Sequence, residues 1–245
     1  MKSISLDNLW QSAVPSASTF SFDILSEIPQ PAKRYLEHAI APGTQLASTV
    51  RLKMHGEIKL QNWSSFQAEQ VINWDQGFIW QATAWVKGLP ILGSDRLING
   101  KGTMQWKLLG LFPVMTASDV NITRSAIGRM QGESIWLPGV LCRPGVKWKA
   151  LDEFEAEATL TRWGETTQLI LNISPTGQLN SIRFQRWGHP QNNGYGNFGG
   201  YLEQESSFSG YTIPTKVRVG WDFTGDHFQG EGEFFRATID HAIYQ

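Results

Sequence analysis

Residues 118–143, SDVNITRSAIGRMQGESIWLPGVLCR, form the one long interval in the middle of the chain that lacks the pattern of a β-strand. On both sides of this interval, apolar and polar residues alternate with the period of strands. Within it, Ile122, Ala126 and Met130 recur every four residues, as on one face of a helix. We therefore predict a central helix over residues 118–137 that lies against a sheet made of the strands before and after it.

Two glycines, Gly128 and Gly132, occupy the predicted helix four residues apart. Each lowers helix stability by roughly 1 kcal/mol relative to alanine, so their presence needs a compensating reason. Close approach is that reason in our interpretation, because a helix edge without side chains can lie directly on the sheet or on a ligand. We expect Asn121 or Thr123 to cap the first turn, and Pro138 to end the segment.

The composition is that of a globular chain without covalent cross-links. The 245 residues include a single cysteine, Cys142, so no disulfide can form within the chain. A net charge of -1 provides no electrostatic footprint for nucleic acid. No apolar run resembles a signal peptide or approaches the ~20 residues of a membrane helix, so we predict a cytoplasmic protein without an integral membrane segment. We expect one domain over residues 1–245, although the length also fits two small ones.

The predicted strands share alternation of apolar and polar residues, and turn residues separate them. They cover residues 49–60, 64–74, 78–87, 91–98 and 103–109 before the central helix, and 146–160, 169–173, 182–184, 201–208, 212–223 and 227–239 after it. The polar run HPQNNGYGNFGG at 189–200 is predicted as a loop. Short helices are predicted over residues 3–14 and 26–40, within an N-terminal segment, 1–45, that packs on the sheet.

These elements predict a mainly β (α+β) fold built on one curved antiparallel sheet. Short connections join most neighbouring strands, so an up-and-down topology is the economical arrangement. A sheet of about 11–12 strands must curl, split or close, because open twisted sheets seldom exceed ~10 strands. Residues 46–245 would form this half-barrel, and the N-terminal helices and the central helix would cover it.

Strand 78–87 is apolar on both faces, with Phe78 and Trp80 on one side and Ile79 and Trp85 on the other. Such a strand is covered on both sides, and the central helix is the available lid for the concave face. The chain also has 11 tryptophans and 13 phenylalanines. Because a buried indole N–H needs a partner, tryptophan favours places where apolar surface meets polar groups, such as pockets. The aromatic excess therefore favours a ligand cavity without identifying the ligand.

Glu133 is the carboxylate whose setting differs from that of the others. Met130 and Trp136 flank it, and a carboxylate in partly apolar surroundings is a candidate for a functional role. The structural alternative is an ion pair with Arg129, four residues earlier on the same helix face, or a capping role. Both interpretations stay open at the level of the sequence.

Asp95 lies within an apolar strand next to Arg96, so it is either a site residue or half of a structural pair. Arg183 and Arg186 point to opposite faces of one strand, so one of them is expected to reach the concave side. The predicted ligand-binding residues are Trp80, Trp85, Asp95, Arg129, Glu133, Trp136, Arg186 and Tyr201.

No motif in the sequence names a reaction, a cofactor or a metal. Gly194, Gly196 and Gly199 spell G-x-G-x-x-G, but a dinucleotide site needs a helix after this motif, and the following residues alternate as a strand. The five histidines never fall at metal-ligand spacing, and HExxH and CxxC are absent. We therefore predict no cofactor, no metal and no catalytic residue.

Several runs of sequence resemble one uncharacterised bacterial family, a domain of unknown function. They are PQPAKRYLEHAIAPG at 29–43, GFIWQA at 77–82, LLGLFPV at 108–114 and GESIWLP at 132–138. The strand-helix-strand layout is similar, at the level of the fold, to the LolA/LolB lipoprotein carriers. Those are unclosed β-barrels whose concave apolar face is covered by helices and receives acyl chains. The violacein-pathway enzyme VioE, which works without cofactor or metal, is also similar in fold. The resemblance implies a lipid-sized cavity.

Three functions are compatible with these observations. The first is binding of an apolar or amphipathic, lipid-like small molecule between the curved sheet and the segment 118–143. The second is a cofactor-independent enzyme of the isomerase or cyclase type in the same cavity. The third is a structural or interaction module, which predicts a barrel filled by its own side chains. A hydrophobic small molecule or lipid is the expected partner, and the sequence does not indicate an oligomeric state.

Overall fold

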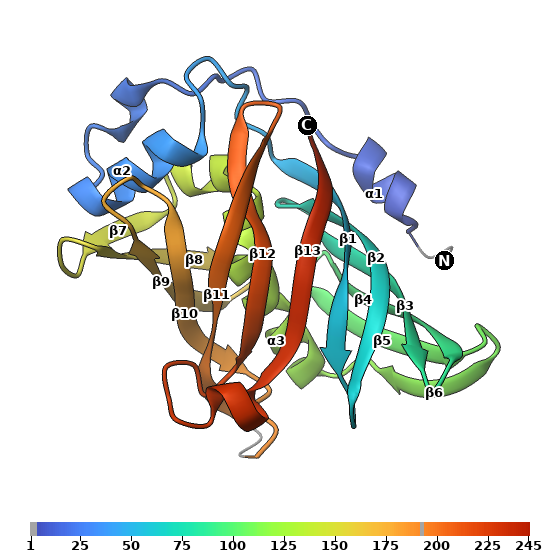
Figure 1. The fold of residues 1–245 in the computed structure, drawn as a ribbon. Coiled ribbons are helices and arrows are strands. Elements are labelled where there is room, and N and C mark those ends of the chain that lie inside the picture. Colours follow the sequence, from blue (N-terminus) through green and yellow to red (C-terminus); the bar gives the residue numbers. More distant parts are fainter. Residues whose placement is uncertain (1–3, 192–193) are drawn as a thin grey trace.

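The computed structural model describes residues 4–191 and 194–245, which form thirteen strands in one antiparallel sheet (Figure 1). The first half of the chain contributes β1 (Thr49–Lys59), β2 (Trp63–Asn73), β3 (Gly77–Val86), β4 (Leu89–Ile98), β5 (Lys101–Leu108) and β6 (Phe112–Ala117). The second half contributes β7 (Lys147–Ala150), β8 (Glu155–Arg162), β9 (Glu165–Ile173), β10 (Leu179–Trp187), β11 (Tyr195–Phe208), β12 (Tyr211–Trp221) and β13 (Glu233–Tyr244).

Helical elements precede, interrupt and follow these strands. They are the α-helices α1 (Leu6–Gln11), α2 (Gln30–Ala39) and α3 (Val120–Gly132), the 3-10 helices η1 (Phe22–Leu25), η2 (Glu133–Trp136) and η3 (Pro138–Cys142), and the π-helical turn η4 (Phe228–Gly232). Each helix of the described residues is too short or too polar to traverse a bilayer.

The order of the strands gives the central helical segment its position. Along the sheet the order is β6-β5-β4-β3-β2-β1-β13-β12-β11-β10-β9-β8-β7, so β1 pairs with β13 and the two edges are β6 and β7. The chain between these edges is the run from α3 to η3. It lies inside the curve of the sheet, where α3 packs against β4, β5, β9 and β10 (Figure 1). The predicted fold class, a curved and unclosed antiparallel sheet covered by helices, is confirmed.

The helix α3 is shorter than the predicted span of 118–137. It ends at Gly132, and the two 3-10 helices η2 and η3 continue the segment to Cys142. Its N-terminus is capped by Asp119, whose Oδ1 accepts hydrogen bonds from the backbone N of Asn121 at 2.8 Å and of Ile122 at 2.9 Å. The prediction of Asn121 or Thr123 as the cap was therefore wrong, since the aspartate directly before the helix accepts from two of its free N–H groups.

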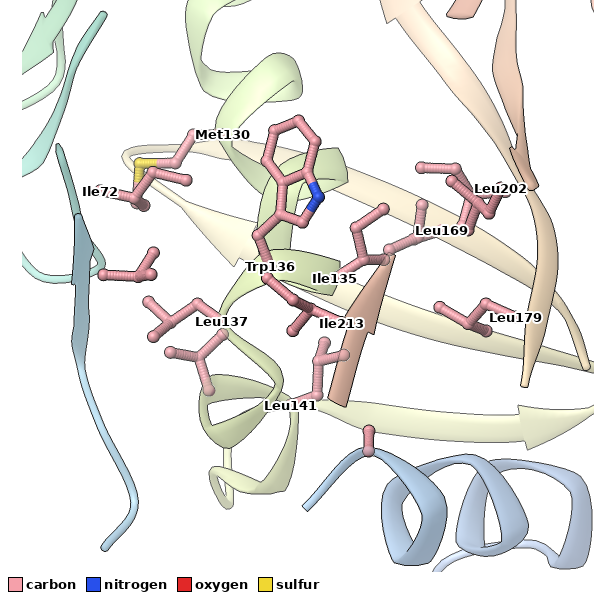
Figure 2. Packing of buried hydrophobic residues seen from close by; sticks show 14 of the residues in the cluster. Ile72, Met130, Ile135, Trp136, Leu137, Leu141, Leu169, Leu179, Leu202 and Ile213 are labelled. Carbon is pink, nitrogen blue, oxygen red and sulfur yellow. The ribbon is translucent and has the colours of Figure 1, made fainter. Parts of the chain in front are cut away.

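The hydrophobic core surrounds the helical segment on both sides (Figure 2). In that view α3 and η2 lie between Ile72 of β2 and the group Leu169, Leu179 and Leu202 of the opposite wall. Trp136 stands in the middle and is almost fully buried, and its indole Nε1 donates to the Pro214 backbone oxygen at 3.0 Å. The segment therefore acts as the internal support of a sheet that has no closing strand.

Strand β3 is covered on both faces, as the sequence predicted. Phe78 and Trp80 face the core, whereas Ile79 and its neighbour Val71 on β2 face outward. The outer pair is buried beneath Leu6 and Leu9 of α1. The predicted helix over 26–40 is confirmed as α2, which packs against β7, β8, β9 and β12. The predicted helix over 3–14 is α1, and residue 3 lies outside the described residues.

Strand boundaries differ from the prediction at several places, and the predicted strand 146–160 is in fact two strands, β7 and β8. Strand β6 has no predicted counterpart, because its residues do not alternate and Pro113 is typical of an edge strand. Strand β11 starts at Tyr195, inside the predicted loop 189–200, of which Asn192 and Asn193 lie outside the described residues. In β11, Gly199 lets the Phe223 ring approach so closely that an added Cβ would lie 2.7 Å from it. The predicted strand 227–239 starts only at residue 233, after η4.

The two helix glycines are expected to respond oppositely to alanine. A Cβ at Gly132 would lie 2.7 Å from carbon atoms of the Phe184 ring, whereas the nearest atom to a Cβ at Gly128 is Arg186 Cγ at 3.5 Å. Gly132→Ala should lower the free energy of unfolding by about 1–3 kcal/mol through overpacking. Gly128→Ala should raise it by up to ~1 kcal/mol through helix propensity. Urea unfolding measures both, and equal effects of the two substitutions would refute the close-approach role of Gly132.

Candidate functional site

A cavity of about 380 Å³ lies between the concave face of the sheet, α3 and η2. Its wall is formed mainly by aromatic and aliphatic side chains from β3, β5 and β10–β13. The aromatic ones are Trp80, Trp106, Trp136, Phe184, Phe198, Phe234 and Phe235. Among the described residues, the charged side chains of the lining are Asp95, Arg129, Glu133 and Arg186. The cavity is therefore an apolar space with one small charged region.

Arg129 of α3 is the centre of the charged region. Its Nε donates to Glu133 Oε1 at 2.7 Å, and its Nη1 donates to Asp95 Oδ2 at 3.0 Å. The guanidinium also lies over the rings of Phe78 and Trp80, with Cζ 4.9 and 5.2 Å from their centroids. Burial alone would lower the pKa of Arg129, but the two carboxylates raise it above its ordinary value. Arg129 therefore remains charged inside the protein.

Glu133 is held from two sides. Besides Arg129, the buried side chain of Gln70 on β2 donates from Nε2 to Glu133 Oε2 at 2.6 Å. Only 14% of the Glu133 side-chain surface and 17% of the Arg129 side-chain surface is exposed to solvent. The predicted ion pair is thus present, but it is an inward-facing pair that lines the cavity and ties α3 to β2 and β4.

Asp95 of β4 is the carboxyl with one oxygen that could still accept a hydrogen bond. Its Oδ2 accepts from Arg129, whereas its Oδ1 is buried and has no hydrogen-bond partner among the described residues. Burial raises the pKa of Asp95, although the charge of Arg129 and a hydrogen-bonding interaction with the Trp106 side chain oppose the shift. Asp95 does not pair with Arg96, because successive strand residues face opposite sides and Arg96 donates to Ser94 Oγ and the Ile4 backbone oxygen instead.

Arg186 of β10 is the second arginine of the cavity, and it faces the concave side as expected for one of the pair Arg183 and Arg186. Its Nε and Nη2 donate to the backbone oxygen and Oγ of Ser125 at 3.4 and 3.3 Å. Its Cζ lies 4.5 Å from the centroid of Phe198. Burial, followed by the nearby charge of Arg129, lowers the pKa of Arg186 to about 10.

Two of the predicted site residues lie outside the cavity. Trp85 is half-exposed on the outer face of β3. It lies an odd number of residues, five, after the inward-facing Trp80, and strand residues at an odd spacing point to opposite faces. Tyr201 is half-exposed and packs against the rings of Phe223 and Phe228. The structure brings the other six predicted residues together around one space: Trp80, Asp95, Arg129, Glu133, Trp136 and Arg186.

The sequence prediction did not include Gln70, Ser125, Trp106 or Phe235. Gln70 carries a recognisable signal, since it occupies an inward position of β2 that alternates with Ile72 and places a polar amide in the core. Ser125, Trp106 and Phe235 have no comparable signal, because their positions depend on how distant strands pair. Phe235 of β13 stacks on Phe66 of β2, with ring centroids 5.1 Å apart.

A larger hollow of about 710 Å³ lies on the outer face of β1–β5. Polar and charged side chains such as Lys53, Gln67, Gln81 and Gln105 line most of it. Ligand sites are mostly apolar concave spaces with a few polar groups, so the smaller inner cavity is the better candidate. No group of three or more metal-binding side chains occurs within the described part of the chain.

Comparisons with known proteins give a family and distant similarities to solved structures. The model of a family described as "Family of unknown function (DUF6920)" matches residues 26–244, which confirms the resemblance predicted from the sequence motifs. The curated proteins include no match. A LolA superfamily protein from Nitrosomonas europaea is 11% identical, with a TM-score of 0.45 and coverage of 94% of both chains. A DUF1329 family protein from Desulfovibrio piger is 10% identical, with a TM-score of 0.41 and coverage of 91% of both chains.

Replacing Glu133 with glutamine should lower the free energy of unfolding by on the order of 3 kcal/mol, because Arg129 loses a charged partner in a buried pair. An exposed i, i+4 pair would contribute no more than ~0.5 kcal/mol. Glu153→Gln, at an exposed position, is the matched control and should stay within ~0.5 kcal/mol of wild type. Urea unfolding followed by circular dichroism measures both. A Glu133→Gln protein as stable as the control would show that the ion pair does not contribute to the stability of the fold.

Proposed function

Since the chain belongs to this family of unknown function, we propose a function from its own geometry: it binds a small amphipathic, lipid-like molecule in the inner cavity. The observation that carries the proposal is an unfilled space of about 380 Å³ with apolar walls. Ligand cavities typically measure ~300–1,000 Å³. A purely structural module would instead fill this space with side chains.

Two buried polar atoms at the cavity support an amphipathic ligand over a wholly apolar one. The indole Nε1 of Trp80 and the Oδ1 of Asp95 are buried, and neither has a hydrogen-bond partner among the described residues. Buried polar groups without partners are uncommon in native proteins. After a small movement of these side chains, the polar end of a ligand could accept from Trp80 or donate to Asp95, while its apolar part contacts the aromatic wall.

The rim of the cavity supports entry of an apolar chain. Leu60, Val114 and Met115 line the cavity and are at the same time largely exposed. They come from the end of β1 and from the edge strand β6. Exposed large apolar side chains that continue into a cavity suit a ligand that is itself apolar.

Filling the cavity should weaken the binding of a fluorescent fatty acid. Met104 of β5 lines the cavity, whereas the next residue, Gln105, is exposed on the opposite face. Met104→Trp adds volume inside the cavity and should weaken saturable binding at least about tenfold, which corresponds to ~1.4 kcal/mol. Gln105→Trp, the matched control, should bind as wild type does. Fluorescence titration gives the affinities, and circular dichroism checks the fold of both variants.

The absence of any saturable uptake by the wild-type protein would contradict the proposal. Native mass spectrometry of freshly purified protein provides an independent reading, because a molecule held in the cavity adds its mass to that of the chain. Equal binding by the Met104 and Gln105 variants would place the binding site outside the inner cavity.

A second candidate function, cofactor-independent catalysis, is favoured by Asp95. A buried carboxyl with a raised pKa and one free oxygen is suited to proton transfer. Molecules that co-purify with wild type and with Asp95→Asn from the same cells can be compared by mass spectrometry and chromatography. An enzyme would carry a product in wild type and its unconverted isomer in the variant. The same molecule in both proteins would exclude Asp95 as the group that drives a reaction.

A further inference from the structure

We propose that the Arg186 guanidinium receives an acidic head group, so that the molecule held in the inner cavity is an amphiphile with a carboxylate. This proposal rests on the proposed function and names the class of ligand for the same cavity. It starts from the unequal sharing of hydrogen bonds among the two carboxylates and two arginines of the lining. Both carboxylates, Asp95 and Glu133, are hydrogen-bonded to Arg129, and Arg186 is left without one.

Arg186 has few partners for a group of its kind. A guanidinium carries five N–H donors, and the described residues accept from Arg186 only at Ser125, at 3.4 and 3.3 Å. Both distances exceed the usual range of ~2.7–3.2 Å. The rings of Phe198 and Trp221 lie 4.5 and 5.7 Å from its Cζ and favour a cation, but they leave the N–H groups in need of acceptors.

The neighbouring arginine of β10 shows what Arg186 lacks. Arg183, on the opposite face of the strand, donates to both oxygens of Glu155, with Nη2 2.6 Å from Oε2. No described carboxylate lies within 4.0 Å of Arg186, whereas Arg129 has two such partners. Arg186 therefore lines the cavity without the carboxylate partner that Arg129 and Arg183 each have.

The missing partner is costly because the group remains charged. Even with its pKa lowered to about 10 by burial, Arg186 keeps its proton at neutral pH. Glu133 and Asp95 favour this charge only from a distance, and a charge taken out of water without a hydrogen-bonded partner is strongly unfavourable. A bound anion supplies the opposite charge together with acceptors for the free N–H groups.

A carboxylate fits this position better than a phosphate does. Either anion can match the planar fork of a guanidinium and accept from the Ser125 hydroxyl beside Arg186, so the charge of the head group decides between them. A phosphate monoester carries close to two negative charges, and it would face Asp95 and Glu133 in the same cavity. The apolar walls accept a hydrocarbon tail. The ligand class is therefore a monocarboxylate with an apolar chain, such as a fatty acid.

The test compares two probes that differ only in the head group, dodecanoate and dodecanol, on wild-type protein at neutral pH. Competition against a fluorescent fatty acid, with isothermal titration calorimetry as a second readout, gives both affinities. Wild type should bind the acid about tenfold more tightly than the alcohol or better. In Arg186→Met this preference should disappear, while the alcohol binds as it does in wild type. Arg183→Met, the matched control on the outer face, should keep the full preference.

The possible outcomes separate this proposal from the proposed function. If neither probe binds wild type by either readout, the proposed function itself fails. If both bind wild type with equal affinity, the cavity binds lipid-like molecules and the role of Arg186 is refuted. The same refutation follows if Arg186→Met keeps the preference for the acid. Should Arg186→Met fail to fold by circular dichroism, the acid-to-alcohol ratio of wild type decides, and Arg186→Gln, which retains two N–H donors without the charge, replaces the variant.

Discussion

The ion pairs of Arg129 are the constraint on which the rest of the structure depends. A guanidinium inside a protein needs charged partners, and Arg129 finds one directly after its own helix, Glu133, and one on β4, Asp95. Glu133 is fixed in turn by Gln70 on β2. Buried ion pairs add little net stability compared with apolar packing. Their effect here is positional, because they hold α3 at one place on the wall formed by β2–β4.

The opposite wall holds the same segment by packing instead of charge. Gly132 lies against the Phe184 ring of β10, and Trp136 is anchored by its hydrogen bond to the Pro214 backbone on β12. The segment from α3 to η3 is thus attached to both halves of the sheet by different interactions. The cavity is the space that these attachments leave between the helix and the wall. Its charged groups are consequently part of the support as well as part of the candidate site.

The sequence predicted those features that depend on local pattern. Alternation located most strands, and the spacing of apolar residues located α3. Alternation fails at β6, an exposed edge with Pro113, and at the start of β11, where glycines replace the side chains that would show it. The alternation of side chains along β3 was sufficient to place Trp85 and Trp80 on opposite faces of the strand, although the prediction put both in one site. The bond between Gln70 and Glu133 joins positions 63 residues apart and follows from strand register, which no local pattern encodes.

The pairing of β1 with β13 has a consequence for how the chain folds. Val50 lies opposite Tyr244, so β1 meets this partner only after 194 further residues have been added to the chain. During synthesis, β1–β6 can pair in sequence as hairpins, but β1 remains an unpaired edge with an apolar inner face until β13 arrives. Contacts between such distant residues slow folding, and exposed strand edges promote association of unfinished chains. The seam in the middle of the finished sheet is thus the place where a nascent chain is most vulnerable to aggregation.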